Sequence, residues 1–235
     1  MKQQISLKRL IFITIFAGLA IIGSLIEIPW IPTPATADLK IDLGEVVILV
    51  SLFLLGAKDT TAIVLIKSLT RRLFKGFDPV PGLIGEAIAL VASLSIILVF
   101  VIVSKVINRI KTRPLLLQTF ENDLEKTKYP KKFMIECLII TPIVLASVMF
   151  LFNFLVATPI YLSYFTLEKT YFNLFSFINH SDFSFKVLFN LCFVSYIPFN
   201  LVKGVVTVLI AIPIVKILQD YLLSNSNQDS NQETL

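Results

Sequence analysis

The sequence is poor in charged residues and contains a single histidine. Asp, Glu, Lys and Arg make up only 16% of the 235 residues, whereas 56% are hydrophobic. A soluble domain carries about 25% charged residues, so this composition argues against a soluble globular protein. The one histidine, His180, has no second histidine with which to hold a metal ion, and we interpret it as a loop residue.

Sequence motifs of known catalytic sites are also lacking. There is no HExxH, no nucleophile elbow, no phosphate-binding loop and no cysteine–histidine pair. The two cysteines, Cys137 and Cys192, lie in apolar segments and are interpreted as buried packing residues rather than disulfide or metal ligands. We therefore predict that the chain is not an enzyme and holds no cofactor or metal. Any step driven by ATP must then be performed by a partner protein.

Long apolar runs dominate what is present, and the mean hydropathy is +0.83. The runs cover about residues 9–29, 43–57, 60–74, 83–107, 133–156 and 190–219. A straight helix needs about 20 residues to cross the hydrocarbon, so the second and third runs must be tilted or screened by longer neighbours. We predict an all-α integral membrane protein of six transmembrane helices in lipid, with one domain over 1–222 and a disordered polar tail over 223–235.

Basic residues set the expected orientation. The stretch 104–132 holds eight Lys and Arg against three acidic residues, and Lys2, Lys8 and Arg9 precede the first run. With six spans both regions lie on one face, which the positive-inside rule places in the cytoplasm together with both termini. We expect a multi-pass protein of the plasma membrane. Topology thus accounts for the net charge of +5, which does not indicate a nucleic-acid partner.

Arg71 and Arg72 are an exception to this distribution of charge. They close the third apolar run and therefore lie at the outer face in the predicted topology. We interpret them as a solvated rim or, alternatively, as a mouth that attracts anions.

Several polar side chains interrupt the apolar runs, although a lysine near the bilayer centre costs about 2.5–3.5 kcal/mol. Asn200 and Lys203 are spaced i, i+3 and share one helix face. By depth they lie in the outer half of the membrane, as does Asn153, and this predicts a pocket that opens outward for a flat polar ligand. Two alternatives remain open: hydrogen bonds that only join helices, and a structural ion pair between Lys203 and Glu86.

The outer loops are expected to contribute to this pocket. The first loop, 29–42, contains three prolines and Trp30, so it is stiff and is predicted to close over the pocket. The fifth loop, about 157–189, is rich in aromatic residues and is predicted to wall the cavity.

Two motifs in the C-terminal half carry a resemblance to a known family. "NFLVATPIY" at 153–161 and "IPFNLVKG" at 197–204 resemble the riboflavin-binding S component of energy-coupling factor (ECF) vitamin transporters. The stretches 39–59 and 82–93 are also similar to that family, but Ala89 and the segment 44–47 depart from its pattern. The resemblance implies that the substrate contacts are made by Asn153, Asn200, Lys203, Tyr161, Glu86 and Asp42.

The same resemblance implies a transport mechanism. The chain would bind riboflavin with high affinity as the substrate-specific subunit. It would dock on a membrane scaffold subunit that carries two ATP-binding subunits, and then topple to bring the vitamin to the cytoplasmic side. Small residues on the first helix would form the docking face, with Thr14, Gly18 and Ala17 as the best match. Ordinary packing within the subunit is the alternative for these residues.

The flavin ring explains why amides and a lysine would be present. Its polar end offers two carbonyls and an N–H, which amides can match because they both donate and accept hydrogen bonds. Left unpaired, each such group costs about 1–3 kcal/mol on burial. Other interpretations remain open: an S component for thiamine, folate or a flavin nucleotide, or an integral membrane enzyme or assembly protein.

Overall fold

The helices follow the apolar runs. The computed structural model describes residues 7–31, 39–75, 81–107, 114–116, 129–166 and 185–232. In chain order the main elements are α1 (Leu7–Leu25), β1 (Glu27–Pro29), β2 (Lys40–Asp42), α2 (Gly44–Leu55), α3 (Ala57–Lys75), α4 (Pro81–Val101), η1 (Ile102–Ile107), α6 (Lys131–Phe152), η2 (Asn153–Ala157), α7 (Thr158–Thr166) and α9 (Phe185–Gln232). Each predicted run is mainly helical, which confirms the all-α prediction.

Four of the described helices are long and apolar enough to cross a membrane. They cover Leu7–Leu25, Gly82–Lys105, Lys131–Tyr161 and Phe185–Leu222, whereas Gly44–Leu55 is a shorter apolar helix. Large apolar side chains on the long helices are exposed, and examples are Ile15, Leu98 and Leu209. Apolar side chains outside and charged side chains inside are the arrangement expected of helices that face lipid.

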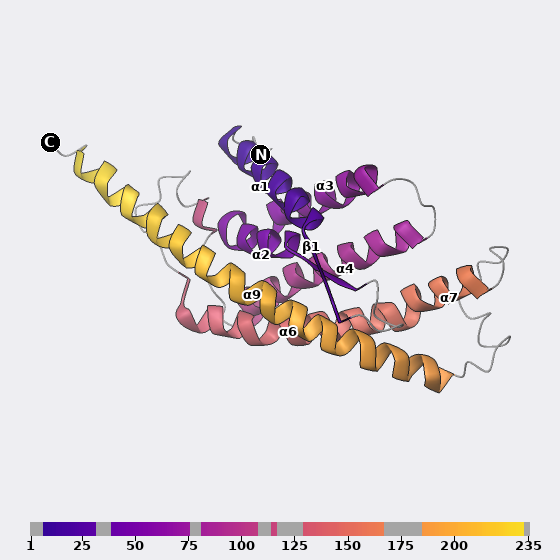
Figure 1. Cartoon of the computed structure of the whole chain (residues 1–235). Coiled ribbons are helices and arrows are strands. Elements are labelled where there is room, and N and C mark those ends of the chain that lie inside the picture. The colour runs from indigo at the N-terminus through magenta and orange to yellow at the C-terminus, as the bar shows by residue number, and fades with distance from the viewer. Residues whose placement is uncertain are drawn as a thin grey trace.

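The short helix α2 lies at the centre of the molecule. Nearly all of its residues are buried, and α1, α3, α4 and α9 pack around it (Figure 1). It ends at Gly56, whose φ of 82° lies in the left-handed region that favours glycine, and whose N–H donates to the Leu52 carbonyl at 3.0 Å. Its neighbours therefore screen a helix that is too short to span the bilayer alone.

Helices α6 and α9 run antiparallel and side by side (Figure 1). A Cβ atom added to Gly204 on α9 would lie 2.6 Å from the Cα of Pro142 on α6. Only glycine allows the two backbones to approach this closely. Helices α6 and α9 are thus held in direct contact, and the turn η2 (Asn153–Ala157), which follows α6, also packs against α9.

The helix that begins with α6 does not end near residue 156. It continues through η2, a π-helical turn, into α7 as far as Thr166. The first part of the predicted fifth loop is therefore helical, while residues 167–184, with His180, lie outside the described residues.

The last helix also runs further than its apolar stretch. Helix α9 extends to Gln232, past the boundary at 222, because backbone hydrogen bonds can continue a helix over polar residues. The division into a domain over 1–222 and a tail over 223–235 stays a prediction.

Between α1 and α2 the chain forms a β-hairpin. Strands β1 and β2 pair antiparallel, with Glu27 opposite Asp42, and the Trp30 N–H donates to the Leu39 carbonyl at 2.9 Å. This hairpin is the described part of the first loop, and residues 32–38 lie outside the described ranges.

Candidate functional site

The lysine in the last apolar run forms an ion pair with a glutamate of the central helix. Lys203 Nζ on α9 lies 2.8 Å from Glu45 Oε1 in the first turn of α2, and the two side chains are 8% and 0% exposed. A buried charge needs such a partner because its desolvation costs several kcal/mol. The alternative pairing of Lys203 with Glu86 is wrong, since Glu86 Oε1 lies 3.1 Å from Arg71 Nε instead.

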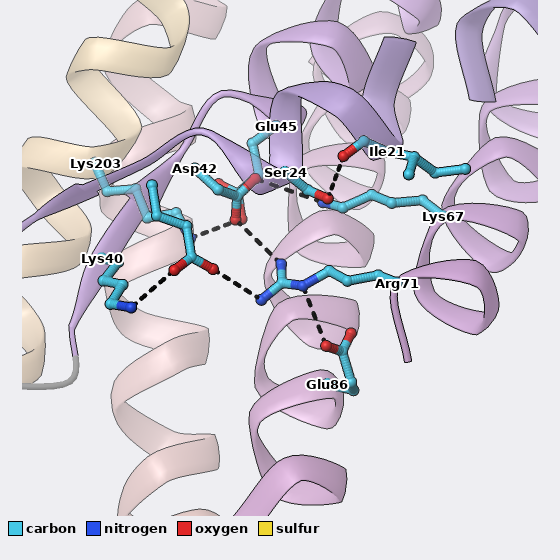
Figure 2. A network of polar contacts seen from close by, with 10 residues as sticks. Ile21, Ser24, Lys40, Asp42, Glu45, Lys67, Arg71, Glu86 and Lys203 are labelled. Atoms are coloured by element: carbon cyan, nitrogen blue, oxygen red, sulfur yellow. Dashed lines mark hydrogen bonds and ion pairs between the residues drawn. The ribbon is translucent and has the colours of Figure 1, made fainter. Parts of the chain in front are cut away.

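Arg71 on α3 is the centre of a second group of charges (Figure 2). Its Nη1 lies 3.7 Å from Asp42 Oδ2 on β2, and its Nη2 lies 3.7 Å from Glu27 Oε1 on β1. With Glu86 on α4, three carboxylates thus surround a guanidinium side chain that is only 11% exposed. The expected solvated rim is therefore wrong for Arg71, which joins the hairpin to α3 and α4.

Two lysines complete this arrangement. Lys67 Nζ, on a side chain 1% exposed, lies 3.7 Å from Asp42 Oδ1, and Lys40 Nζ lies 2.8 Å from Glu27 Oε2. We use the term ionic network for eight side chains: Glu27, Lys40, Asp42, Glu45, Lys67, Arg71, Glu86 and Lys203. Four of them are acidic and four are basic, so the formal charges of the ionic network sum to zero.

Asp42 links the two halves of the ionic network. Burial raises the pKa of its carboxyl, but the positive charges of Lys67, Lys203 and Arg71 outweigh burial and hold that pKa below its ordinary value. A hydrogen bond from the Gly44 backbone acts in the same direction. Asp42 is therefore an anion at neutral pH, within the field of all three cations.

The two asparagines of the family-like motifs are both buried and anchored to their own helices. Asn200 Nδ2 donates to the Tyr196 carbonyl at 2.8 Å, and Asn153 Nδ2 donates to the Met149 carbonyl at 2.7 Å. The remaining polar atom of Asn153, Oδ1, is buried and has no hydrogen-bond partner among the described residues. Asn153 also begins the π-helical turn η2, a distortion frequently found at functional sites.

Aromatic side chains connect the hairpin to this part of α9. The rings of Trp30 and Phe199 pack edge to face with centroids 5.6 Å apart. Lys203 Nζ lies 5.9 Å from the centre of the same Phe199 ring. Trp30, just after β1, is thereby in contact with the residue that precedes Asn200.

The other predicted substrate contacts, Asp42, Glu86 and Tyr161, lie on three different elements, β2, α4 and α7. Asp42 and Glu86 belong to the ionic network, where both interact with Arg71. Tyr161 on α7 is half-buried and faces α4, because a Cβ added to Gly85 would lie 3.9 Å from its hydroxyl. Tyr161 therefore lies against the residue that precedes Glu86.

The three predicted docking residues on α1 differ in exposure. Thr14 is exposed, Gly18 is half-buried, and a Cβ added to Gly18 would meet no atom within 4 Å. Ala17 is 3% exposed and belongs to the hydrophobic core. The surface at Thr14 and Gly18 is open, whereas Ala17 packs within the subunit.

Sequence reasoning missed Glu45 and the role of Arg71. Glu45 was noted only within a segment that departs from the family pattern, yet it is the partner of Lys203. The sequence does offer one signal for these residues. Buried charges are normally paired, so each basic residue within or beside an apolar run predicts an acidic partner in another run. Within the described ranges, no three His, Cys, Asp or Glu side chains are placed to hold a metal ion.

Comparison with known proteins places this geometry in a family. Residues 8–215 match the family model described as "ECF transporter, substrate-specific component". The fold is similar to a solved structure of the S component of a bacterial ECF transporter, with a TM-score of 0.60 and 23% identity, covering 92% of this chain and 97% of the other. No curated protein matches the sequence. The chain therefore belongs to the family of substrate-specific components of ECF transporters, membrane transport subunits that are not enzymes and that work with a scaffold subunit and ATPase subunits.

Proposed function

We propose that this subunit binds riboflavin from the outer side of the plasma membrane and delivers it to an ATP-driven ECF transporter. The observation that carries the proposal is the burial of Asn153, Asn200 and Lys203 on helical segments that pack together. Counted over the whole residue, their exposed fractions are 1%, 2% and 6%. These are residues of the two riboflavin-type motifs. Two amides and an ammonium group can together meet the two carbonyls and the N–H of the flavin ring.

The unsatisfied oxygen of Asn153 supports a ligand at this place. A buried amide oxygen without a donor costs about 1–3 kcal/mol, and a ligand N–H or O–H would remove that cost. Lys203 has further N–H groups beyond the one directed at Glu45, because an ammonium group carries three donors. Both residues can therefore make a ligand contact without first losing a protein contact.

The balanced charges of the ionic network favour a neutral substrate over the alternatives. Riboflavin carries no charge at neutral pH, whereas thiamine is a cation and folate and flavin nucleotides are anions. A charged ligand beside a network that already sums to zero would bring an uncompensated charge into a poorly solvated site. The electrostatics thus favour riboflavin over its phosphate and over both other vitamins.

The direction of transport follows from the proposed orientation. With the basic stretch 104–132 and both termini in the cytoplasm, the hairpin and the motif residues lie toward the outer face. The subunit would capture riboflavin in a pocket open to that face and dock on the scaffold through the surface at Thr14 and Gly18. It would then topple in the membrane and release the vitamin inside.

A vitamin panel tests the assignment. Purified protein is titrated with riboflavin, flavin mononucleotide, thiamine and folate by isothermal titration calorimetry. We expect riboflavin to bind at least about tenfold more tightly than every charged member of the panel, which corresponds to about 1.4 kcal/mol. Tighter binding of thiamine or folate would assign the subunit to that vitamin, and tighter binding of the phosphate would assign it to the nucleotide.

A further inference from the structure

Helix α1 is embedded less deeply than the other long helices. A smaller share of its residues is buried than in the other three candidate membrane spans. Its buried residues are Ile13, Ala17, Ala20, Gly23 and Ser24. Core packing therefore holds the later turns of α1 better than its first turns, although the surface proposed for docking begins at Thr14.

The C-terminal end of α1 is fixed by close backbone contact with the start of α2. A Cβ atom added to Gly23 would lie 3.0 Å from the Gly44 backbone nitrogen, so the two backbones touch. The Leu43 N–H also donates to the Gly23 carbonyl at 3.1 Å. This end of the helix cannot shift without disturbing α2, the central helix.

The N-terminal end of α1 is held by a bidentate ion pair with α3. Arg9 Nε donates to Asp59 Oδ2 and Arg9 Nη2 donates to Asp59 Oδ1, each at 2.7 Å. The side chains of Arg9 and Asp59 are 24% and 8% exposed. Two charge-assisted hydrogen bonds to one carboxylate fix the orientation of both side chains as well as their separation. The ion pair therefore fastens the first turn of α1, where core packing is weakest.

Asp59 belongs to a rigid junction between α2 and α3. The Ser51 and Thr60 hydroxyls share a hydrogen bond of 3.0 Å, which joins the two helices beside Asp59. The Thr60 N–H donates to the Gly56 carbonyl at 3.1 Å. Gly56 is also covered by Pro114, whose Cγ would lie 2.7 Å from an added Cβ. The ion pair thus ties the first turn of α1 to a part of the core that is itself fixed.

We propose that Arg9 and Asp59 are positioning residues for docking on the scaffold subunit. Their ion pair sets the place of α1 against α3 and so holds the surface at Thr14 and Gly18 ready for the partner. This inference rests on the proposed function, because it takes that surface as the place of docking. At 1.5 Å per residue, Thr14 lies about 7.5 Å along the helix from Arg9, so a displacement of the first turn reaches it. A surface already held in place loses less freedom on binding and therefore binds more tightly.

The position of α1 can be measured without any ligand or partner. Spin labels are attached at Leu10→Cys on α1 and Ile135→Cys on α6, both of which are exposed positions. The native cysteines, Cys137 and Cys192, are buried and so are poorly accessible to the label. We expect double electron–electron resonance to give a broader distance distribution in Asp59→Asn than in the otherwise unchanged protein. A pair that contributed only to stability would leave the distribution of the folded protein unchanged.

Asp59→Asn is the decisive variant for docking. It keeps the size of the side chain but removes its charge, and it lies on α3 rather than on the docking helix. Arg9 is partly exposed and can turn to solvent, so no charge is left buried. The variant is co-expressed with the scaffold and ATPase subunits, and the amount that co-purifies with a tagged ATPase subunit is measured. We expect that amount to fall about fivefold or more, the scale of coupling between separate sites.

Lys8→Gln is the matched control. It removes one positive charge from the same turn of α1, but Lys8 is exposed and lies outside the ion pair, so co-purification and the distance distribution should both stay as in the wild type. Arg9→Gln serves as a second variant in case Asp59→Asn does not fold, and it should show the same loss. The double variant Arg9→Gln/Asp59→Asn should lose no more than either single variant, because the two residues act as one unit.

The outcomes separate this inference from the proposed function. Co-purification needs no vitamin, so a wild-type subunit that joins the scaffold but binds no riboflavin would refute the proposed substrate, while the variants still decide this inference. If Gly18→Leu co-purifies normally, the docking surface lies elsewhere and this inference fails with it. The inference alone is overturned if folded Asp59→Asn or Arg9→Gln protein co-purifies like the wild type. It is also overturned if the two losses add in the double variant, because the two residues would then act independently.

Discussion

Trp30 of the hairpin packs edge to face against Phe199 of α9, with ring centroids 5.6 Å apart. The hairpin is also joined to α3, by the ion pairs of Arg71 with Glu27 and Asp42. The described part of the first loop is therefore attached to the helices through two different elements. One point of attachment is Phe199, the residue next to Asn200. Asn200 itself is proposed to contact the ligand.

The Trp30 contact predicts the kinetics of ligand release. Trp30→Ala removes the aromatic attachment of the hairpin and should raise the dissociation rate of riboflavin with a smaller change in association. The reason is that ordering a cover affects release more than capture. Stopped-flow flavin fluorescence measures both rates. Trp30→Phe is the matched control, because it keeps an aromatic ring against Phe199, and an unchanged dissociation rate in Trp30→Ala would show that the hairpin is only a connector.

The Lys203–Glu45 pair predicts the stability of two variants. Lys203→Met leaves the carboxylate of Glu45 buried without a partner, which should destabilise the subunit by about 3–5 kcal/mol. Adding Glu45→Gln removes that charge and should restore most of the stability without restoring riboflavin binding. Thermal unfolding in detergent without ligand measures both effects. The pairing would be refuted by a double variant no more stable than Lys203→Met alone.

The lowered pKa of Asp42 predicts an acid sensitivity. A carboxyl whose pKa in the folded state lies below its ordinary value of 3.8 stabilises the fold above that value, and this contribution is lost as the pH falls through the folded-state pKa. Stability without ligand should therefore hold at neutral pH and decline in the acid range. Asp42→Asn should be less stable at pH 7 and should lose less on acidification. Equal acid profiles for the two proteins would contradict the assigned charge interactions.

The open surface on α1 predicts separable effects on uptake and binding. Gly18→Leu places a large side chain where a Cβ meets no atom of the subunit, so folding and riboflavin binding should be unchanged. The same side chain would hold a partner helix away, and riboflavin uptake in cells should be lost. Gly18→Ala adds only a methyl group and should retain uptake. Normal uptake by Gly18→Leu would place the docking surface elsewhere.

How well the sequence predicts the structure depends on how far apart in the chain the interacting residues lie. Apolar runs report burial in lipid along one segment, so the helices were predictable from the sequence. The i, i+3 spacing of Asn200 and Lys203 is also a local pattern, and it predicted that both residues lie on one helix face. The partner of Lys203 was not predictable, because Glu45 reaches it only through the packing of α2 against α9. The path of the chain from Asn153 to Thr166 also depends on a π-helical turn that has no clear sequence signal.

Riboflavin binding by the wild-type subunit and by Asn200→Ala, compared by isothermal titration calorimetry, is the most direct test of the proposed function. Asn200 is 2% exposed, and its amide nitrogen is held by the Tyr196 carbonyl, so the variant removes a fixed and buried contact. We predict that the wild-type protein binds riboflavin and that a folded Asn200→Ala protein loses about 1–3 kcal/mol of binding free energy. A wild-type subunit that binds no riboflavin, or a folded variant with unchanged affinity, would contradict the account.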